Sequence, residues 1–371
     1  MSGGRRALVL AVGIVAALAP GALLRCGLGE TAAAQDAGVP SIAAGPWPFA
    51  FMQPDVVVDR TARRTMNARE VVARTLAADD HVVSLFAASA IDVDGPRFLA
   101  KLRDIEALRT SKIVPTVRRF SSPPAPGDLA DLRLEAKDLD AVASCEPGDC
   151  GLKLTAGEIR RLRAAIDRAG GGWRPVAQAE FRRVVLERVR AYLERGRSAL
   201  APYHDHADPV DPAGVFAGLI GGLGFLRERY PAFAEHVERY PVAPLELVDS
   251  FLYWSIEDYA PRPILTVWHD LILRGPGRPG EPELLVVSSQ VMATHYLDGA
   301  MAVTALVRDE ADPDRRYLAY VNRVSVDLLG GVMGGVRRFF LERRLRSDAR
   351  NIFAAQRSRL EGREERVDDA E

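Results

Sequence analysis

The chain has 371 residues, of which 49 are lysine or arginine and 50 are aspartate or glutamate, so its formal net charge is −1. This balance gives no electrostatic reason to expect a nucleic-acid partner or binding to an anionic membrane surface. A hydrophobic fraction of 48% is sufficient for a buried core, and the length allows two domains of roughly 150 residues each.

The first 34 residues have the pattern of a secretory signal peptide. A basic start with Arg5 and Arg6 precedes a short apolar core, and a small-residue A-x-A site ends at Ala34. We expect cleavage after Ala34 and a periplasmic or secreted mature chain without a transmembrane span. The alternative is an uncleaved N-terminal anchor, although the apolar core is shorter than the about 20 residues that a spanning helix needs.

The pattern from residue 61 to residue 245 is mostly helical, after a stretch at 35–60 whose Gly, Pro and Ala content predicts a flexible lead-in. A capping box formed by Thr155 and Glu158 predicts the start of one helix. Helical patterns lie at 67–78, 96–108, 156–169, 175–200 and 212–229. Two apolar runs typical of strands lie at 81–93 and 112–120.

Two cysteines, Cys145 and Cys150, remain after removal of the signal peptide, and a Pro-Gly turn separates them. An even cysteine count in an exported chain favours a local disulfide between them. A metal pair is the alternative, but no histidine or second cysteine pair lies nearby in the sequence.

Five strand-like runs follow, at 248–256, 263–273, 284–297, 300–308 and 317–326. Asp298-Gly299 separates two of them and predicts a tight hairpin, because both residues tolerate positive φ. A helical pattern then begins at Leu328, and residues 351–371 form a charged tail. We therefore predict an α+β fold, in which a helical N-terminal part precedes an antiparallel meander sheet packed on a long C-terminal helix within residues 246–350.

The predicted meander suggests a ligand cavity between the sheet and the C-terminal helix. Neither face of the sheet is cleanly polar, so we expect both to be covered. Glycines at 330, 331, 334 and 335 would let the helix approach the sheet or a bound molecule. With Leu297 opposite Ala300 and Arg308 opposite Tyr317, the expected ligand-binding residues are Trp254, Trp268, Gln290, Met292, Tyr320 and Asn322, with His295 and Arg323 as polar anchors.

A packed core with a few satisfied polar groups explains the same pattern and stays open as the alternative to a cavity. Similarly, Arg323 could meet an acid from the N-terminal part instead of a ligand, because buried charges are usually paired.

Strands that curl around a C-terminal helix resemble the helix-grip architecture of START-like lipid and small-molecule binders. A second resemblance rests on the cysteine loop with Lys153-Leu154, the Trp254-Ser255 strand, and the runs Thr294-His295-Tyr296 and Asn322-Arg323. Together these features are similar to an uncharacterised family of predicted exported bacterial proteins. The first resemblance implies ligand binding, and the second implies export.

No familiar catalytic signature is present in the sequence: there is no P-loop, G-x-S-x-G, H-E-x-x-H or G-x-G-x-x-G motif. The best metal candidate is His204 with His206 and Asp208, because imidazole and carboxylate groups are zinc ligands. These residues lie between two prolines in an expected surface loop, where ordinary solvated side chains are the alternative. We predict no catalytic residue and no cofactor.

Binding of a hydrophobic or amphipathic small molecule is the leading functional hypothesis. One alternative is a hydrolase-type enzyme that uses His295 or the loop around His204. The other is an envelope structural or partner-binding protein, for which the charged tail is the suggestive feature. Enzyme activity is the less favoured of these readings.

Overall fold

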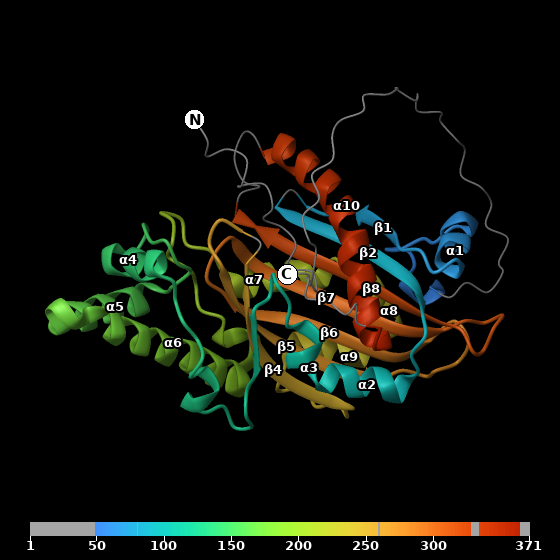
Figure 1. Ribbon diagram of the computed structural model, residues 1–371, viewed down its shortest axis with the longest axis horizontal. Coiled ribbons are helices and arrows are strands. Elements are labelled where there is room, and N and C mark those ends of the chain that lie inside the picture. Colours follow the sequence, from blue (N-terminus) through green and yellow to red (C-terminus); the bar gives the residue numbers. More distant parts are fainter. Residues whose placement is uncertain (1–48, 80, 259, 328–333, 364–371) are drawn as a thin grey trace, which may run out of the picture.

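The structure is a computed structural model that describes residues 49–79, 81–258, 260–327 and 334–363, with the backbone alone for 334–347. Its centre is an eight-stranded antiparallel sheet with helices on both faces (Figure 1). The predicted α+β class with an antiparallel sheet is confirmed. The expected signal peptide, most of the expected lead-in and the glycines at 330 and 331 lie outside the described residues.

The strand order is β1-β2-β8-β7-β6-β5-β4-β3, so the first strands of the chain lie beside its last strand. The two strand-like runs of the N-terminal half, expected at 81–93 and 112–120, are β2 and β3 and belong to this same sheet. The expected boundary near residue 245 therefore does not separate a helical part from the sheet. The bounds are β1 (Val72–Leu76), β2 (Val82–Ile91), β3 (Thr116–Arg119), β4 (Asp249–Glu257), β5 (Ile264–Arg274), β6 (Pro282–Ala293), β7 (Leu297–Arg308) and β8 (Arg316–Val326).

One face of the sheet, which we call the α10 face, packs against three helices, and α10 crosses in front of the strands in Figure 1. Buried Phe98, Leu108 and Phe353 of these helices share a core with Val286 and Leu318 of the strands. This face of the sheet is therefore buried, in agreement with the near-continuous apolar residues of its strands. The three helices are α2 (Gly95–Arg103), α3 (Ile105–Arg109) and α10 (Gly334–Glu361).

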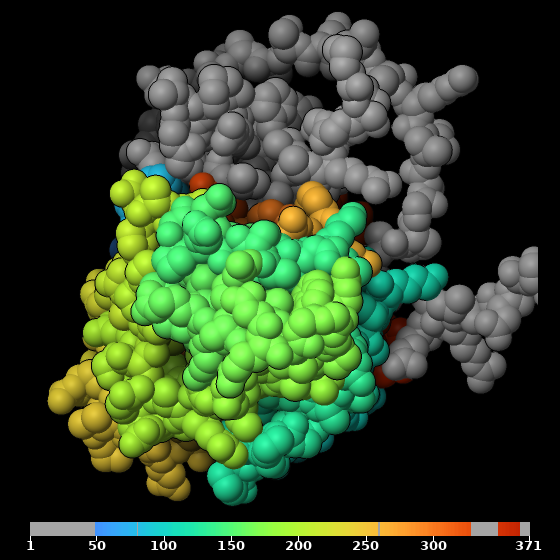
Figure 2. Space-filling model, turned by 90° about the vertical axis from the view of Figure 1, so that its left-hand side faces the viewer, coloured from blue at the N-terminus to red at the C-terminus, as the bar shows by residue number. Residues whose placement is uncertain are grey.

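The opposite face, which we call the α7 face, shares a larger core with the helices that precede β4. Phe181 and Leu219 of these helices pack in one core with Trp254, Val287 and Val303 of the strands. The helices α4, α5 and α6 lie at the left-hand end of the molecule in Figure 1 and form much of the surface that Figure 2 shows. The bounds are α4 (Ala136–Ser144), α5 (Ala156–Ala169), α6 (Trp173–Arg195), α7 (Pro212–Gly221), α8 (Gly224–Arg229) and α9 (Pro231–Arg239).

The predicted hairpin turn at Asp298-Gly299 is wrong, because both residues belong to β7 and Gly299 pairs with Ser325 of β8. The connection from β6 to β7 instead runs through Tyr296, whose φ is +62°. Gly299 has a different purpose: a Cβ there would lie 2.9 Å from Cγ1 of Val215 on α7. The glycine thus permits close packing of helix on strand. Both predicted registers are wrong, because Leu306 pairs with Leu284 and Arg308 pairs with Arg316.

Two expectations near the chain ends are also corrected. The helical pattern at 67–78 contains the end of α1 (Arg60–Asn67) and then the strand β1. At the other end, α10 continues to Glu361 with Ala349, Phe353 and Leu360 buried, so residues 351–361 are part of the fold and not of a solvated tail.

Other local predictions agree with the structure. Thr155 and Glu158 form the capping box of α5, and the Sγ atoms of Cys145 and Cys150 lie 2.05 Å apart as a disulfide. Among the described residues, no helix combines the length and the apolar character needed to cross a membrane.

Candidate ligand-binding cavity

A cavity of about 60 Å³ lies between the α10 face of the sheet and the helices α2, α3 and α10. Its wall is mainly apolar, with a smaller polar group that comes from the strands and from α3 and α10. The apolar lining residues are Phe98, Leu102, Ile105, Leu108, Val286, Leu318, Ile352, Phe353 and Leu360, and the polar ones are Arg109, Tyr253, Asp270, Ser288, Thr304, Tyr320 and Gln356.

Arg109, the last residue of α3, brings a positive charge into this cavity although its side chain is only 8% exposed. Its Nη1 donates to Oη of Tyr253 at 2.6 Å, and its Nη2 lies 3.6 Å from Oε1 of Glu257. The guanidinium also lies over the rings of Tyr253 and Trp268, at 5.2 and 6.0 Å. Burial opposes the charge, but the neighbouring tyrosine and acids outweigh it and raise the pKa of Arg109. The arginine therefore stays charged.

Asp270 of β5 adds a carboxyl group to the same wall and is 3% exposed. Burial raises the pKa of Asp270 to about 6, while a hydrogen bond from Ser288 and the charge of Arg109 oppose this shift. The charge of Arg109 is already shared with Glu257, which accepts hydrogen bonds from Ser255 (3.0 Å) and Thr266 (2.9 Å). An ionised Asp270 would leave the cavity with one negative charge in excess.

Three polar atoms around the cavity have no hydrogen-bond partner within the described part of the chain. They are Nε of Arg109, Oδ1 of Asp270 and Oε1 of Gln356. All three residues are more than nine-tenths buried. Leaving a buried polar atom without a partner costs about 1–3 kcal/mol, so such atoms in a native protein indicate a bound water or ligand group.

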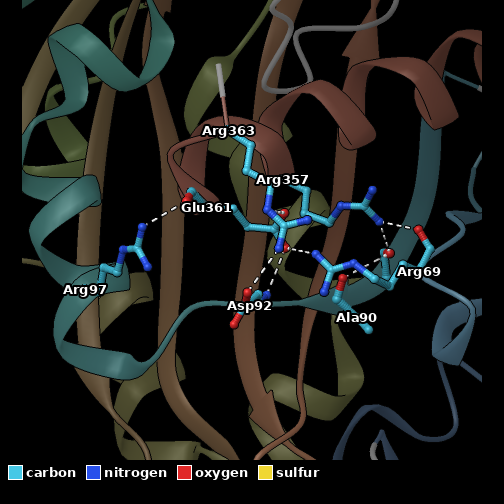
Figure 3. A network of polar contacts seen from close by, with 8 residues as sticks. Arg69, Ala90, Asp92, Arg97, Arg357, Glu361 and Arg363 are labelled. Carbon is cyan, nitrogen blue, oxygen red and sulfur yellow. Dashed lines mark hydrogen bonds and ion pairs between the residues drawn. The ribbon is translucent and has the colours of Figure 1, made fainter. Parts of the chain in front are cut away.

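The far end of α10 is held in place by the polar network in Figure 3. The Glu361 carboxylate accepts hydrogen bonds from Arg69 and from the backbone N–H of Asp92 (2.9 Å), and its side chain is 2% exposed. Arg97 donates to the Glu361 carbonyl at 2.9 Å, and Arg357 donates to Oγ of Ser89 at 2.6 Å. These contacts fix the last turns of α10, which carry the cavity residues Phe353, Gln356 and Leu360.

The structure brings together only part of the predicted ligand-binding set. Tyr320 lines the cavity, and Trp268 lies on the same face under Arg109. Gln290 pairs with Trp268 across β5 and β6 but does not line the cavity. Asn322 uses its side-chain oxygen to accept from the Leu85 N–H at 3.0 Å.

The other predicted residues do not reach this cavity. Trp254 and Met292 lie in the core of the α7 face, and Trp254 donates to the carbonyl of Asp128. Arg323 pairs with Met301 of β7, and its guanidinium packs against Gly222 at the end of α7. The predicted single wall is therefore wrong, because a one-residue change of register turns a side chain to the opposite face of the sheet.

The two expected polar anchors, His295 and Arg323, have separate partners. Nε2 of His295 lies 3.2 Å from Oδ2 of Asp138 on α4, and Arg323 reaches the carbonyl of Ala77 at 3.5 Å. His295 thus pairs with an acid from the N-terminal half. A contact of this kind is the alternative to ligand binding that the sequence left open for Arg323.

Sequence reasoning missed Arg109, Asp270 and Gln356 as members of one site. Asp270 carried a usable signal, since it is a lone acid within an otherwise apolar strand. Arg109 and Gln356 carried no such signal. Arg109 ends a helix and Gln356 lies within one, and charged and polar residues are common in helices.

A serine–histidine contact elsewhere bears on the hydrolase alternative. Ser250 Oγ lies 2.8 Å from Nε2 of His269, whose Nδ1 lies 3.1 Å from the hydroxyl of Tyr192. Burial, with a smaller effect of His236, lowers the pKa of His269 to about 3. Such a weak base is poorly matched to proton abstraction near neutral pH, so this contact does not add support for the hydrolase alternative.

The chain gives no match to any protein-family model, and neither the curated proteins nor the solved structures contain one that is significantly similar to it.

Proposed function

We propose that the protein binds a small amphipathic molecule whose polar end enters the cavity beside Arg109. The observation that carries the proposal is the set of three buried polar atoms without a partner among the described residues, Nε of Arg109, Oδ1 of Asp270 and Oε1 of Gln356, in an otherwise apolar wall. Ligand sites commonly combine apolar walls with a few polar groups in this way.

The three atoms favour a particular head group. Two of them accept hydrogen bonds and one donates, so an alcohol hydroxyl, which both donates and accepts, fits the set. A carboxylate head would lie beside Asp270 and Glu257 and could only accept. The charge excess around Asp270 disfavours such an anion further.

The volume limits how much of the ligand the cavity accommodates as it stands. About 60 Å³ holds a few water molecules or a short head group, whereas ordinary ligand pockets have roughly 300–1,000 Å³. A longer apolar tail therefore requires α2 or α10 to move outward. We expect this movement away from Glu361, since the network of Figure 3 holds that end of α10.

We also propose that the protein is exported and shares the helix-grip arrangement. The Cys145–Cys150 disulfide supports export, because disulfides persist mainly in oxidising compartments. An antiparallel sheet covered on one face by two short helices and by the C-terminal helix supports the second point.

The test compares 1-octanol, octanoate and octylamine, which share one tail, by calorimetry on the purified mature chain. We expect octanol to bind, octanoate to bind at least tenfold more weakly, and Gln356→Leu to weaken octanol binding. The matched control is Gln290→Leu, which removes a buried amide on β6 that does not line the cavity. If none of the three compounds binds, or if both variants bind octanol equally well, the proposal is wrong.

A further inference from the structure

A second cluster of charged residues gathers at the end of the sheet where β8 ends, and none of its residues lines the cavity. Four segments meet there, and backbone hydrogen bonds fix three of their contacts. The Cys150 N–H donates to the Asp205 carbonyl (3.1 Å), that of Lys153 donates to Thr294 (3.0 Å), and that of Asp327 donates to Tyr296 (3.1 Å). The side chains at this junction are thus held in place by the main chain and by the adjacent disulfide loop.

Lys153 is the centre of the cluster and is only 1% exposed. Its ammonium group donates to Asp205 Oδ2 (3.1 Å), Asp298 Oδ1 (2.9 Å) and Asp327 Oδ1 (2.9 Å). The side chains of these aspartates are 7, 13 and 17% exposed. Three carboxyl groups thus face one ammonium ion, and buried charge is costly unless it is paired or bound to a metal.

His206 brings a further ligand group to the same place. Its Nε2 lies 3.5 Å from Oδ2 of Asp205, and its side chain is 64% exposed. One ligand atom each from Asp205, His206 and Asp327 lies within 4.8 Å of the other two. Metal bonds from such groups are about 2.0–2.2 Å long, so a small movement of the exposed His206 ring would bring all three onto one ion.

Asp205 provides the independent sign of a missing partner. Its residue is 7% exposed, and its Oδ1 has no hydrogen-bond partner among the described residues while Oδ2 faces Lys153. Lys153 also takes only one oxygen of Asp327. The lysine therefore contacts one oxygen of each carboxylate and leaves Oδ1 of Asp205 available to a further partner.

We propose that Asp205, His206 and Asp327 bind a divalent transition-metal ion such as Zn²⁺. The ion would add positive charge where three carboxyl groups face a single ammonium ion, and imidazole with carboxylates is a ligand set that suits such ions. Three protein ligands leave a position for water on the solvent side. The ion would link the loop that contains Asp205 to Asp327, which directly follows β8.

This site regroups the residues that the sequence had suggested. Asp205 and Asp327 replace His204 and Asp208 beside His206. His204 directs Nδ1 to the carbonyl of Pro202 at 3.2 Å, and both His204 and Asp208 lie outside the group. His204 is therefore a matched control, a nearby histidine of the same loop that the proposed ion does not touch.

The experiment uses the full mature chain, dialysed against a chelator and then titrated with Zn²⁺ in competition with a chromophoric chelator. We expect one ion per chain, at least tenfold weaker binding in His206→Ala, and unchanged binding in His204→Ala. Spectra of bound Mn²⁺ are compared between Asp205→Asn and the unmodified chain. They test the role of the Asp205 carboxylate, as the histidine variants test that of His206.

Absence of stoichiometric Zn²⁺ binding would overturn the proposal and leave Lys153 as the only cation of the cluster. Equal weakening by the two histidine variants would also overturn it, since that result assigns the ion to another surface site. His206 is exposed, so failure to fold will not obscure the comparison.

Discussion

Replacement of Asp270 by asparagine tests the electrostatics of the cavity most directly. Burial raises the pKa of this carboxyl from 3.8 to about 6 in the folded protein. A difference of about 2 pKa units corresponds to about 3 kcal/mol between the protonated and ionised forms. The folded state thus binds this proton more tightly than the unfolded chain does.

The sign of the pH effect follows from that difference. The stability that protonated Asp270 contributes is complete below about pH 4 and is lost as the pH rises through about 6. Asparagine keeps the shape of the side chain and cannot ionise. We compare the free energy of unfolding of Asp270→Asn with that of the unmodified protein at each pH. We expect this difference to shift in favour of the variant by about 2–3 kcal/mol between pH 4 and pH 8.

Urea denaturation of both proteins at the two pH values measures this double difference, in which the other titrating groups cancel. Asp314→Asn, at an exposed aspartate, controls for the loss of one negative charge. A variant that is equally or more destabilised at pH 8 would refute the reasoning, because it would mean that Arg109 holds Asp270 ionised in the folded state at no cost.

Four further variants test other parts of the structure. Glu361→Gln removes the charge that anchors the end of α10, and we expect a loss of about 1.5–3 kcal/mol and faster hydrogen exchange in β2; normal exchange would contradict the anchoring role. Phe353→Ala should cost about 3–5 kcal/mol and admit longer alcohols in calorimetry, because it enlarges the cavity; unchanged chain-length preference would argue against the site. Gly299→Ala places a Cβ against Val215 and should cost about 1–3 kcal/mol in urea denaturation; a neutral effect would show that α7 is free to shift. Replacement of Cys145 and Cys150 by serine should cost about 2 kcal/mol for so short a loop, and an unchanged denaturation midpoint would contradict that loop argument.

Much of the fold could be predicted because it depends on local pattern. Runs of apolar and β-branched residues identified β4 to β8, and the capping box located the start of α5. The pattern failed at β1, whose sequence Val72–Leu76 mixes apolar residues with an arginine and reads equally well as a helix. Pairing with β2 decides its conformation, and such tertiary context overrides propensity.

The site could not be predicted because it depends on register and on distant contacts. Asp298-Gly299 has the composition of a hairpin turn, but Asp298 is bonded to Lys153 and Gly299 makes room for α7. Reading these two residues as a turn displaced the β6–β7 pairing, and a mixed list from both faces of the sheet resulted. Arg109 and Gln356 reach Asp270 from helices that precede and follow the strands, and no local spacing connects them.

The pairing of β2 with β8 has a consequence for how the protein is made. Ile91 pairs with Arg316 and Val82 with Ser325, so the pairing of β2 with β8 joins residues more than 200 positions apart in the chain. Contacts of such long range form late and slow the search for the native topology. The nascent polypeptide cannot close its sheet until nearly all of it has left the ribosome, and an open chain of this kind can be threaded through a secretion pore, as the proposed export requires.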